Sequence, residues 1–401
     1  FQEGIRIPPL KYSSKGIMNA TLLKLLKLNV RLPDSFQGDL NAQIAACEIG
    51  RRRLCDLENR YGVETLKSIF SDLLNRSELM TRQAIQTLPD GSHSYVDYLD
   101  NDGIDLDTPI KIEVSVLVQG DSVHIDFSGT SQQVRGPFNL MPSGAYAAAY
   151  FAVHAMTDPS IPTNGGCFRP IKLILPPKSI VNPEEPAPVN ARTSTMKRVA
   201  GCITSALGQF LPDRAPADAA GEMLLLAFGG ERIDGSRYVV GELIASGSGA
   251  SEGMDGVDVI ETDGTNCMNL PVEALEMDVP IRVHKTELST GSGGSGKFRG
   301  GLGLIREYEI LHGTVVFTHR GERHSHPARG LMGGEPGGKA YSKIKRRDGK
   351  EIVIKSKTVE TLGIGDQILV QTAGGGGYGC PTERPEHLHR NDIADRKTFD
   401  R

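Results

Sequence analysis

A strict alternation of apolar and polar residues is the feature that most constrains how this chain can fold. Every second residue of Ile110–Val118 is apolar, and Val123, Ile125 and Phe127 continue the pattern after a Gln-Gly-Asp turn at 119–121. Alternation with a period of two is typical of strands that bury one face. The stretch therefore predicts a β-hairpin with one buried face.

Helical spacing dominates the first ninety residues and recurs in the middle of the chain. Apolar residues at intervals of three and four, with capping or turn residues at the ends, indicate amphipathic helices. The glycine at position 62 is expected to end the longest of them. The predicted helices run from a cap at Asp34 or Ser35 to Tyr61, and over Val63–Leu74, Ser77–Leu88, Ser143–Met156, Thr193–Phe210 and Asp218–Phe228.

Short strands and glycine turns make up the chain from about Arg237 onward. Glycine accounts for 47 of the 401 residues, about 12% against a usual figure of about 7%. It permits tight turns and close backbone approaches. Besides the hairpin, the predicted strands are Ile171–Leu175, Tyr238–Ala245, Ile281–Leu288, Leu304–Leu311, Thr314–Thr318, Glu351–Lys355 and Gln367–Gln371.

Together these patterns predict an α+β fold with a helical N-terminal region, a mixed middle and a glycine-rich, largely antiparallel β C-terminal region. No fixed-period repeat is present, which excludes a solenoid or a propeller. The predicted regions are residues 1–92 (helical), 93–236 (mixed α/β), 237–382 (β-rich with glycine loops) and 383–401 (a polar tail).

Charge and cysteine content narrow the classes of function. The 45 basic and 49 acidic residues leave a net charge of −4, which favours neither nucleic acid nor an anionic membrane as a partner. The six cysteines form no C-x-x-C pair and are widely spaced, as is typical of reduced thiols in a cytosolic protein. No apolar run reaches the length of a membrane span. We therefore expect a cytoplasmic protein.

The segment Gly291–Lys297 (GSGGSGK) satisfies two nucleotide-binding patterns. A phosphate loop needs a Ser or Thr after the lysine and a helix that begins there. Here Phe298 and the glycine-rich segment Arg299–Gly303 follow instead. We therefore interpret the segment as a connection between strands.

Histidines and basic residues gather in two further segments. His319, His324 and His326 lie among arginines, whose charge opposes a bound cation and suits an anion better. This segment is predicted to be an exposed loop. The basic residues at 343–347 precede an Asp-Gly dipeptide, which is typical of hairpin turns, and we interpret them as a solvated strand end.

Two polar segments are candidates for a functional site. Asn190 and Arg192 stand directly before a predicted helix, where backbone N–H groups and the guanidinium can hold an anion. The segment Asp263–Glu273 places amides and carboxylates in one loop. Amides suit an amide-like substrate, and a carboxylate can act as a base. A self-bonded loop stabilised by Asx turns is an equally open interpretation.

Short motifs spread over nearly the whole chain carry further information. They are Gln2–Pro9 (QEGIRIPP), Gly38-Asp39-Leu40, Ala42-Gln43, Leu99–Gly103 (LDNDG), Asp126–Thr130 (DFSGT), Arg135–Asn139 (RGPFN), Asn266-x-x-Asn269-x-Pro271-x-Glu273, Gly296–Gly303 (GKFRGGLG) and Gly374–Gly379 (GGGGYG). Each motif alone is weak. In this order, the chain resembles the hydantoinase B/5-oxoprolinase family, the B-type subunits of ATP-dependent N-methylhydantoinases.

The resemblance implies a chemistry divided between two subunits. In the family, an A-type partner binds ATP and phosphorylates the lactam or imide oxygen, and the B-type subunit hydrolyses the activated ring amide. Phosphorylation makes a poor electrophile reactive, but water must still be activated and the oxyanion stabilised. The candidate catalytic residues are Asn266, Asn269 and Glu273, and the candidate substrate-binding residues are Asn190, Arg192 and Asp263.

The resemblance also implies partners and cofactors. It predicts a hetero-oligomer with an A-type, ATP-binding hydantoinase subunit and a small cyclic amide as substrate. Family members bind a divalent metal through His and Asp residues of an N-terminal portion that has no counterpart in this sequence, so we expect the metal ligands to be absent from this chain. Acetone and acetophenone carboxylases are similar to the family, which leaves two alternatives: a carboxylase subunit, or a non-catalytic scaffold of such a complex.

Overall fold

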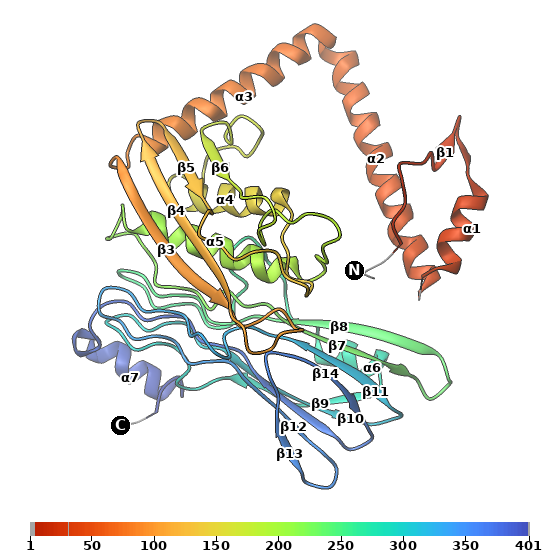
Figure 1. Ribbon diagram of the computed structural model, residues 1–401, viewed down its shortest axis with the longest axis vertical. Coiled ribbons are helices and arrows are strands. Elements are labelled where there is room, and N and C mark those ends of the chain that lie inside the picture. Colours follow the sequence, from red (N-terminus) through yellow and green to blue (C-terminus); the bar gives the residue numbers. More distant parts are fainter. Residues whose placement is uncertain (1–4, 31, 400–401) are drawn as a thin grey trace. The chain divides into compact units, whose positions relative to one another are not determined.

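The computed structural model describes residues 5–30 and 32–399. They divide into two compact units, a larger one of residues 80–162 and 168–399, and a smaller one of residues 5–79 and 163–167 without residue 31. The first three residues of the motif Gln2–Pro9 lie outside the described residues. Most elements of both units are labelled in Figure 1. The mixture of helices and antiparallel sheets confirms the predicted α+β class.

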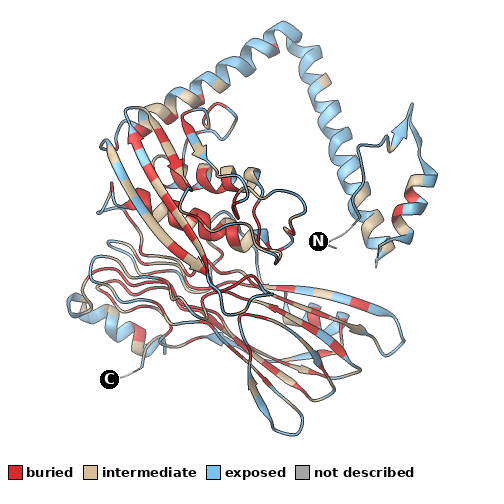
Figure 2. Ribbon diagram, in the orientation of Figure 1, coloured by how far each residue is buried: buried red, intermediate tan, exposed pale blue. Residues whose placement is uncertain are grey.

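The smaller unit is mostly helical, as predicted for this part of the chain. It contains the short strands β1 (Ser13–Ser14) and β2 (Ile17–Met18), the helices α1 (Ala20–Leu28) and α2 (Pro33–Tyr61), and most of α3 (Val63–Ile85). Helix α2 ends at Gly62, whose φ of 77° lies in the left-handed region that glycine adopts freely. Within α2, which the structure describes in full, no residue is buried, as Figure 2 shows.

Helix α3 corrects one prediction. The sequence suggested two helices with a break near Ser77, whereas the structure has one continuous helix. Serine and asparagine favour helix ends because their side chains compete for backbone groups. Here Ser77 is buried, and its hydroxyl accepts a hydrogen bond from Nδ2 of Asn164 at 2.7 Å. The side chain that suggested a cap is therefore used in packing within the unit.

A four-stranded sheet covered by two helices forms the first layer of the larger unit. The strand order is β3 (Gly91–Leu99), β4 (Ile110–Gln119), β5 (Ser122–Asp126) and β6 (Ile171–Ile174), with only the β5–β6 pair parallel. The helices are α4 (Pro142–Met156) and α5 (Arg192–Gly208), which pack against each other and cover the sheet (Figure 1). Buried and less buried residues alternate along β4, which confirms the predicted hairpin (Figure 2).

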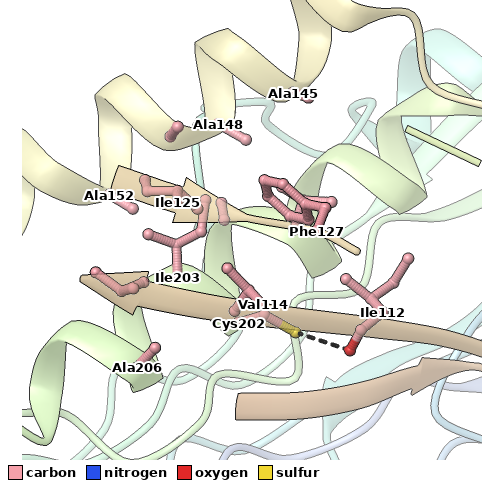
Figure 3. Packing of buried hydrophobic residues seen from close by; sticks show 14 of the residues in the cluster. Ile112, Val114, Ile125, Phe127, Ala145, Ala148, Ala152, Cys202, Ile203 and Ala206 are labelled. Atoms are coloured by element: carbon pink, nitrogen blue, oxygen red, sulfur yellow. Dashed lines mark hydrogen bonds between the residues drawn. The ribbon is translucent and has the colours of Figure 1, made fainter. Parts of the chain in front are cut away.

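The core of this layer depends on small residues in the helices. Alanines of α4 approach the branched side chains of β4 and β5 closely, and Ile203 and Ala206 of α5 complete the cluster (Figure 3). Cys202 lies in the same core, with Sγ 3.9 Å from the carbonyl oxygen of Ile112. Because alanine adds little bulk, both helices can lie close to the sheet.

Two antiparallel sheets form the second layer of the larger unit, and apolar side chains from both make one buried cluster. The first has the order β14 (Lys357–Leu362), β11 (Val315–Arg320), β7 (Leu224–Glu231) and β8 (Arg237–Ile244). The second has the order β13 (Glu351–Val353), β12 (Tyr341–Lys345), β15 (Gln367–Gln371), β10 (Leu304–Ile310) and β9 (Ile281–Leu288). Peripheral to them are α6 (Val272–Asp278), the 3-10 turn η1 (Pro381–Glu383) and α7 (Glu386–Ala394).

The strand β7 corrects a second prediction. The helix expected over Asp218–Phe228 is absent, since residues 218–223 have no regular structure and Leu224 begins the strand. Small residues favour helix as a local preference, but from Leu224 burial alternates with a period of two and β7 pairs with both neighbours. Tertiary pairing therefore overrides the local preference. The strands β3 and β14 were not predicted.

Glycine residues lie at the closest backbone–backbone contacts of the larger unit. The segments 246–251, 292–303 and 373–378, here called the glycine segments, are hydrogen-bonded to one another. Gly301 N donates to Ser248 O at 2.8 Å, and Gly375 N donates to Gly301 O at 2.9 Å. A Cβ on Gly301 would lie 2.0 Å from the carbonyl oxygen of Val257. The segment Gly291–Lys297 runs between β9 and β10 without a following helix, which confirms its interpretation as a connection.

None of the helices in the part of the chain that the structure describes is long and apolar enough to cross a membrane.

Gly301→Ala is expected to lower the free energy of unfolding by about 3 kcal/mol or more, because the new methyl group meets backbone that cannot move aside. The control is Gly363→Ala, where a Cβ meets nothing within 4 Å, and its stability should stay within about 0.5 kcal/mol of the wild type. Urea unfolding of the three proteins measures both effects. Equal stability of the two variants would show that the glycine segments are not tightly packed.

Candidate functional site

A small charged pocket lies beside helix α5, in the larger unit. Its cavity volume is about 160 Å³, and its lining comes from β3, α5, the segments 216–221 and 248–249, the segment at 262–263, and the loop after β11. We call it the α5 pocket. Six charged side chains line it: Asp97, Lys197, Arg198, Asp218, Asp263 and Arg323.

Asp97 lies between two guanidinium groups at this pocket. Its carboxylate accepts from Nη1 of Arg198 at 2.7 Å and lies 2.9 Å from Nη2 of Arg323. It also accepts from the backbone N–H of Tyr98 at 2.8 Å. Burial opposes ionisation, but the charges of Arg198 and Arg323 outweigh it and hold the pKa of Asp97 well below its usual range.

The two arginines differ in how many of their hydrogen-bond donors have a partner. The guanidinium of Arg323 donates to Asp97 and to the carbonyl oxygens of four residues, Ala219, Ala220, His326 and Pro327. Arg198 is 2% exposed and donates only through Nη1. Its Nε and Nη2 are buried and have no hydrogen-bond partner among the described residues.

Lys197 fixes the segment that carries Asp263. The fully buried ammonium donates to Glu261 at 3.2 Å, to the carbonyl oxygen of Thr262 at 2.6 Å and to the hydroxyl of Thr265 at 3.0 Å. Asp263 itself adopts a φ of 60° and accepts from the hydroxyl of Thr262 at 2.9 Å. Burial raises the pKa of Asp263 above that of an ordinary aspartate, although the charge of Lys197 opposes the rise.

Residues 217–220, which belong to the segment 216–221 in the lining of the α5 pocket, are hydrogen-bonded to the glycine segments. Ala217 N donates to Ala250 O at 2.8 Å, Ala220 N donates to Gly247 O at 3.0 Å, and Gly376 N donates to Asp218 O at 2.9 Å. The carboxylate of Asp218 accepts from Ser205 at 2.8 Å and from the Tyr95 hydroxyl at 2.5 Å. Backbone bonds on one side and side-chain bonds on the other therefore fix Asp218.

Gly221 lies close to both Asp263 and Arg198. A Cβ built on Gly221 would lie 3.2 Å from Oδ2 of Asp263 and 3.9 Å from Nη1 of Arg198. Gly221 also has a φ of 56°, which a residue with a side chain rarely adopts. A glycine at this position thus leaves open the space between a carboxyl group and a guanidinium.

Of the residues proposed from the sequence, the structure brings only Asp263 to the α5 pocket. Asn190 lies before α5 and accepts from Nη1 of Arg320 at 2.6 Å, and Arg192 is exposed in the first turn. In the loop, Asn266 is exposed and Asn269 is partly buried. Glu273 is exposed in the first turn of α6. Their roles stay predictions.

Comparison with known proteins agrees with the resemblance carried by the motifs. The family model described as Hydantoinase B/oxoprolinase matches residues 1–381. The chain belongs to the hydantoinase B/oxoprolinase family. It is 32% identical to the B-type subunit of a putative D-/L-hydantoinase from Pseudomonas sp. strain NS671, over 98% of this chain and 68% of that protein.

Two solved structures share the fold of this family member. The ATP-dependent caprolactamase from Pseudomonas jessenii superposes with a TM-score of 0.90 at 29% identity, over 99% of this chain and 70% of the other. A nucleotide-free acetone carboxylase superposes with a TM-score of 0.89 over 98% of this chain and 59% of the other. Its identity is 18%, so that likeness concerns the fold alone.

Little in the sequence pointed to Arg198 and Asp97, whereas Arg323 is one of the arginines of the histidine segment, which were predicted to suit an anion better than a cation. Asp97 and Arg198 are 101 residues apart, and no local motif joins them. One signal was available in the predicted helix 193–210, where Lys197-Arg198 stands among small and apolar residues. Lysine and arginine are almost never fully buried unless they are paired. Such a pair inside a helix covered on all sides predicts buried carboxylate partners.

The histidine segment corrects a third prediction. It was expected to be an exposed loop, but His319 is fully buried on β11, where it follows Val315 and Phe317 on the buried face. Its Nδ1 lies 2.9 Å from the carbonyl oxygen of Ser356 and its Nε2 lies 2.9 Å from the Ser342 hydroxyl. Burial lowers the pKa of His319 to about 3, so the ring is neutral at physiological pH.

No group of three or more His, Cys, Asp or Glu residues that could hold a metal ion occurs in residues 5–30 and 32–399. The described side chains therefore do not fit the divalent-metal site that the family resemblance implies. No step proposed below requires such a site in this chain.

A buried carboxyl group, Glu222, lies next to the pocket wall. It accepts from the backbone N–H groups of Glu322 at 2.8 Å and Ala373 at 3.3 Å. Burial raises the pKa of Glu222 to about 8, and the nearby carboxylates of Glu322 and Asp100 add to the rise. At neutral pH the folded protein therefore holds a proton here that the unfolded chain has lost.

Glu222→Gln is expected to change how stability depends on pH. Because the folded-state pKa lies above the ordinary 4.5, the wild type loses stability as the pH rises from about 4.5 towards 8, at up to about 1.4 kcal/mol per pH unit. The variant lacks this loss. Urea unfolding at pH 5, 6.5 and 8 measures the difference, with the exposed Glu231→Gln as the control. Parallel pH curves for wild type and Glu222→Gln would contradict the assignment.

Proposed function

We propose that this chain is the hydrolytic subunit of an ATP-dependent cyclic amidase that opens hydantoin- or 5-oxoproline-type rings after an A-type partner subunit has phosphorylated them. The observation that carries the proposal is the α5 pocket, which Asp263 and Arg198 both line close to Gly221, within a member of the hydantoinase B/oxoprolinase family. Relatives named hydantoinase and caprolactamase subunits support the reaction class.

The size and charge of the pocket suit this chemistry. A cavity of about 160 Å³ is smaller than the roughly 300–1,000 Å³ of sites for drug-sized ligands, and so favours a small ring. A phosphorylated amide places negative charge on the substrate, and attack by water adds charge to the carbonyl oxygen. Fixed guanidinium groups in a buried site stabilise both.

Asp263 is the residue we propose to move the proton. A general base works best when its pKa lies near the working pH, and burial moves the pKa of Asp263 in that direction. The bonds from Lys197 to its neighbours Thr262 and Thr265 keep the carboxyl group in place. In this scheme the carboxylate of Asp263 accepts a proton from the attacking water.

Other residues of the same loop have proposed supporting roles. The amides of Asn266 and Asn269 would anchor the ring or polarise its carbonyl group, and Glu273 would orient water or transfer a proton. Asn190 and Arg192 would contact the substrate's anionic part at the start of α5. A cytoplasmic hetero-oligomer with the ATP-binding subunit completes the proposal, and the net charge of −4 offers no attraction to nucleic acid.

Asp263→Asn is expected to lower ring-opening turnover by about 10²- to 10⁴-fold, because it removes a proton acceptor and keeps the shape of the side chain. Activity is measured with the A-type subunit and ATP as release of the ring-opened acid. The matched control is Asp348→Asn, which keeps the exposed β12–β13 turn because Asn-Gly also suits it. Since the base must be ionised, the remaining wild-type rate should fall with pH below a midpoint above the usual aspartate range.

Glu273→Gln is measured beside these variants. A large loss there together with normal turnover of Asp263→Asn would move the proton transfer to α6 and contradict the assignment. The carboxylase alternative is tested with the same preparation, by comparing ketone-dependent bicarbonate fixation with ring opening. Ring opening that proceeds equally fast without ATP would contradict the proposed function itself.

A further inference from the structure

Arg198 has unused hydrogen-bonding capacity in the α5 pocket. Two guanidinium groups share the carboxylate of Asp97, while Asp218 and Asp263 also line the pocket. Arg323 uses its donors on protein oxygens. Arg198 does not, since its Nε and Nη2 have no partner among the described residues although the side chain is only 2% exposed. The unused donors therefore belong to Arg198.

Buried donors without acceptors are costly. Leaving one unpaired loses its hydrogen bonds to water without replacement, and the cost is larger when the group is charged, so such groups in native proteins call for an explanation. Here the side chain lines a cavity of about 160 Å³, which has room for a small ligand. No hydrogen bond joins the carboxyl group of Asp263 to these donors, and its described hydrogen bond comes from the hydroxyl of Thr262.

We infer that Arg198 is the anion-recognition residue of the α5 pocket, and that the ligand presents a compact group with two acceptor oxygens, a carboxylate or a phosphoryl group, to its free N–H donors. This inference rests on the proposed function and adds the substrate feature that the pocket selects. A guanidinium binds such groups through two parallel hydrogen bonds, whereas an ammonium acts as a point charge. A neutral lactam alone offers one carbonyl oxygen and leaves one of the two donors of Arg198 unpaired.

The two sources of such an anion can be separated by probes that need no turnover. Binding of inorganic phosphate, of 5-oxoproline and of 2-pyrrolidinone, which is the same ring without the carboxylate, is measured by titration calorimetry at constant ionic strength. Phosphate binding that depends on Arg198 identifies the phosphoryl group as the ligand. A preference for 5-oxoproline over 2-pyrrolidinone that depends on Arg198 identifies a substrate carboxylate.

Arg198→Lys is the decisive variant, because it keeps the charge beside Asp97 and removes the two-donor edge. The substitution should weaken binding of the anion by about ten- to hundredfold, as expected for the loss of charge-assisted hydrogen bonds of about 1.5–3 kcal/mol. Arg198→Gln should abolish the preference. Should Arg198→Gln fail to fold, as judged by circular dichroism and thermal melting, the lysine variant alone decides. The control is Arg214→Lys, an exposed arginine on the segment that leads to the pocket wall.

Unchanged anion affinity in folded Arg198→Lys would overturn the inference, as would a loss that follows Arg192→Lys instead. Failure of all three probes to bind the wild type would overturn it too. These results are independent of the proposed function, which is tested by ATP-dependent ring opening. An active enzyme whose affinity for the anion does not change when Arg198 is replaced would refute the inference alone. An inactive chain whose α5 pocket binds the anion through Arg198 would refute the proposed function alone.

Discussion

The ion trio of Asp97, Arg198 and Arg323 is the interaction on which the site depends. It joins strand β3, helix α5 and the loop after β11, so it connects the helix-covered sheet to the paired antiparallel sheets. Burying charged groups is expensive, and removing one partner of a buried pair costs about 3–5 kcal/mol. A trio with one carboxylate for two guanidinium groups adds to that cost. If Arg198 recognises an anion as we infer, its unpaired donors in the lining of the α5 pocket have a use that packing alone does not give them.

The glycine segments supply the second condition for this pocket. Charged side chains of the first layer meet the second layer only if the chain between them occupies very little space. Backbone packed directly on backbone achieves this, as the contact of Gly301 with Val257 shows. The same segments accept and donate the hydrogen bonds that hold residues 217–220. The glycine segments and the buried charged pocket are therefore linked. Backbone without side chains leaves room for the charged side chains that line the pocket.

Much of the fold could be predicted because its signals are local. The alternation over 110–118 and the helix at 193–210 follow from periodicity, and the structure confirms both. The failures arise where a distant segment decides, as at 218–228, where pairing with β8 and β11 makes a strand of helix-favouring residues. The site follows the same division. Asp263 was found from a polar loop, whereas Arg198 and Asp97 lie 101 residues apart and only the fold brings them together.

The proposed arrangement would also couple ligand binding to proton affinity. The positive charges of Lys197 and Arg198 oppose the rise that burial gives the pKa of Asp263. An anion on the free donors of Arg198 neutralises part of that charge and places negative charge near the carboxylate. Both effects raise the pKa further. If Arg198 recognises an anion as we infer, Asp263 would become a stronger base when that anion binds, so the residue that recognises the ligand would also tune the residue proposed to take the proton.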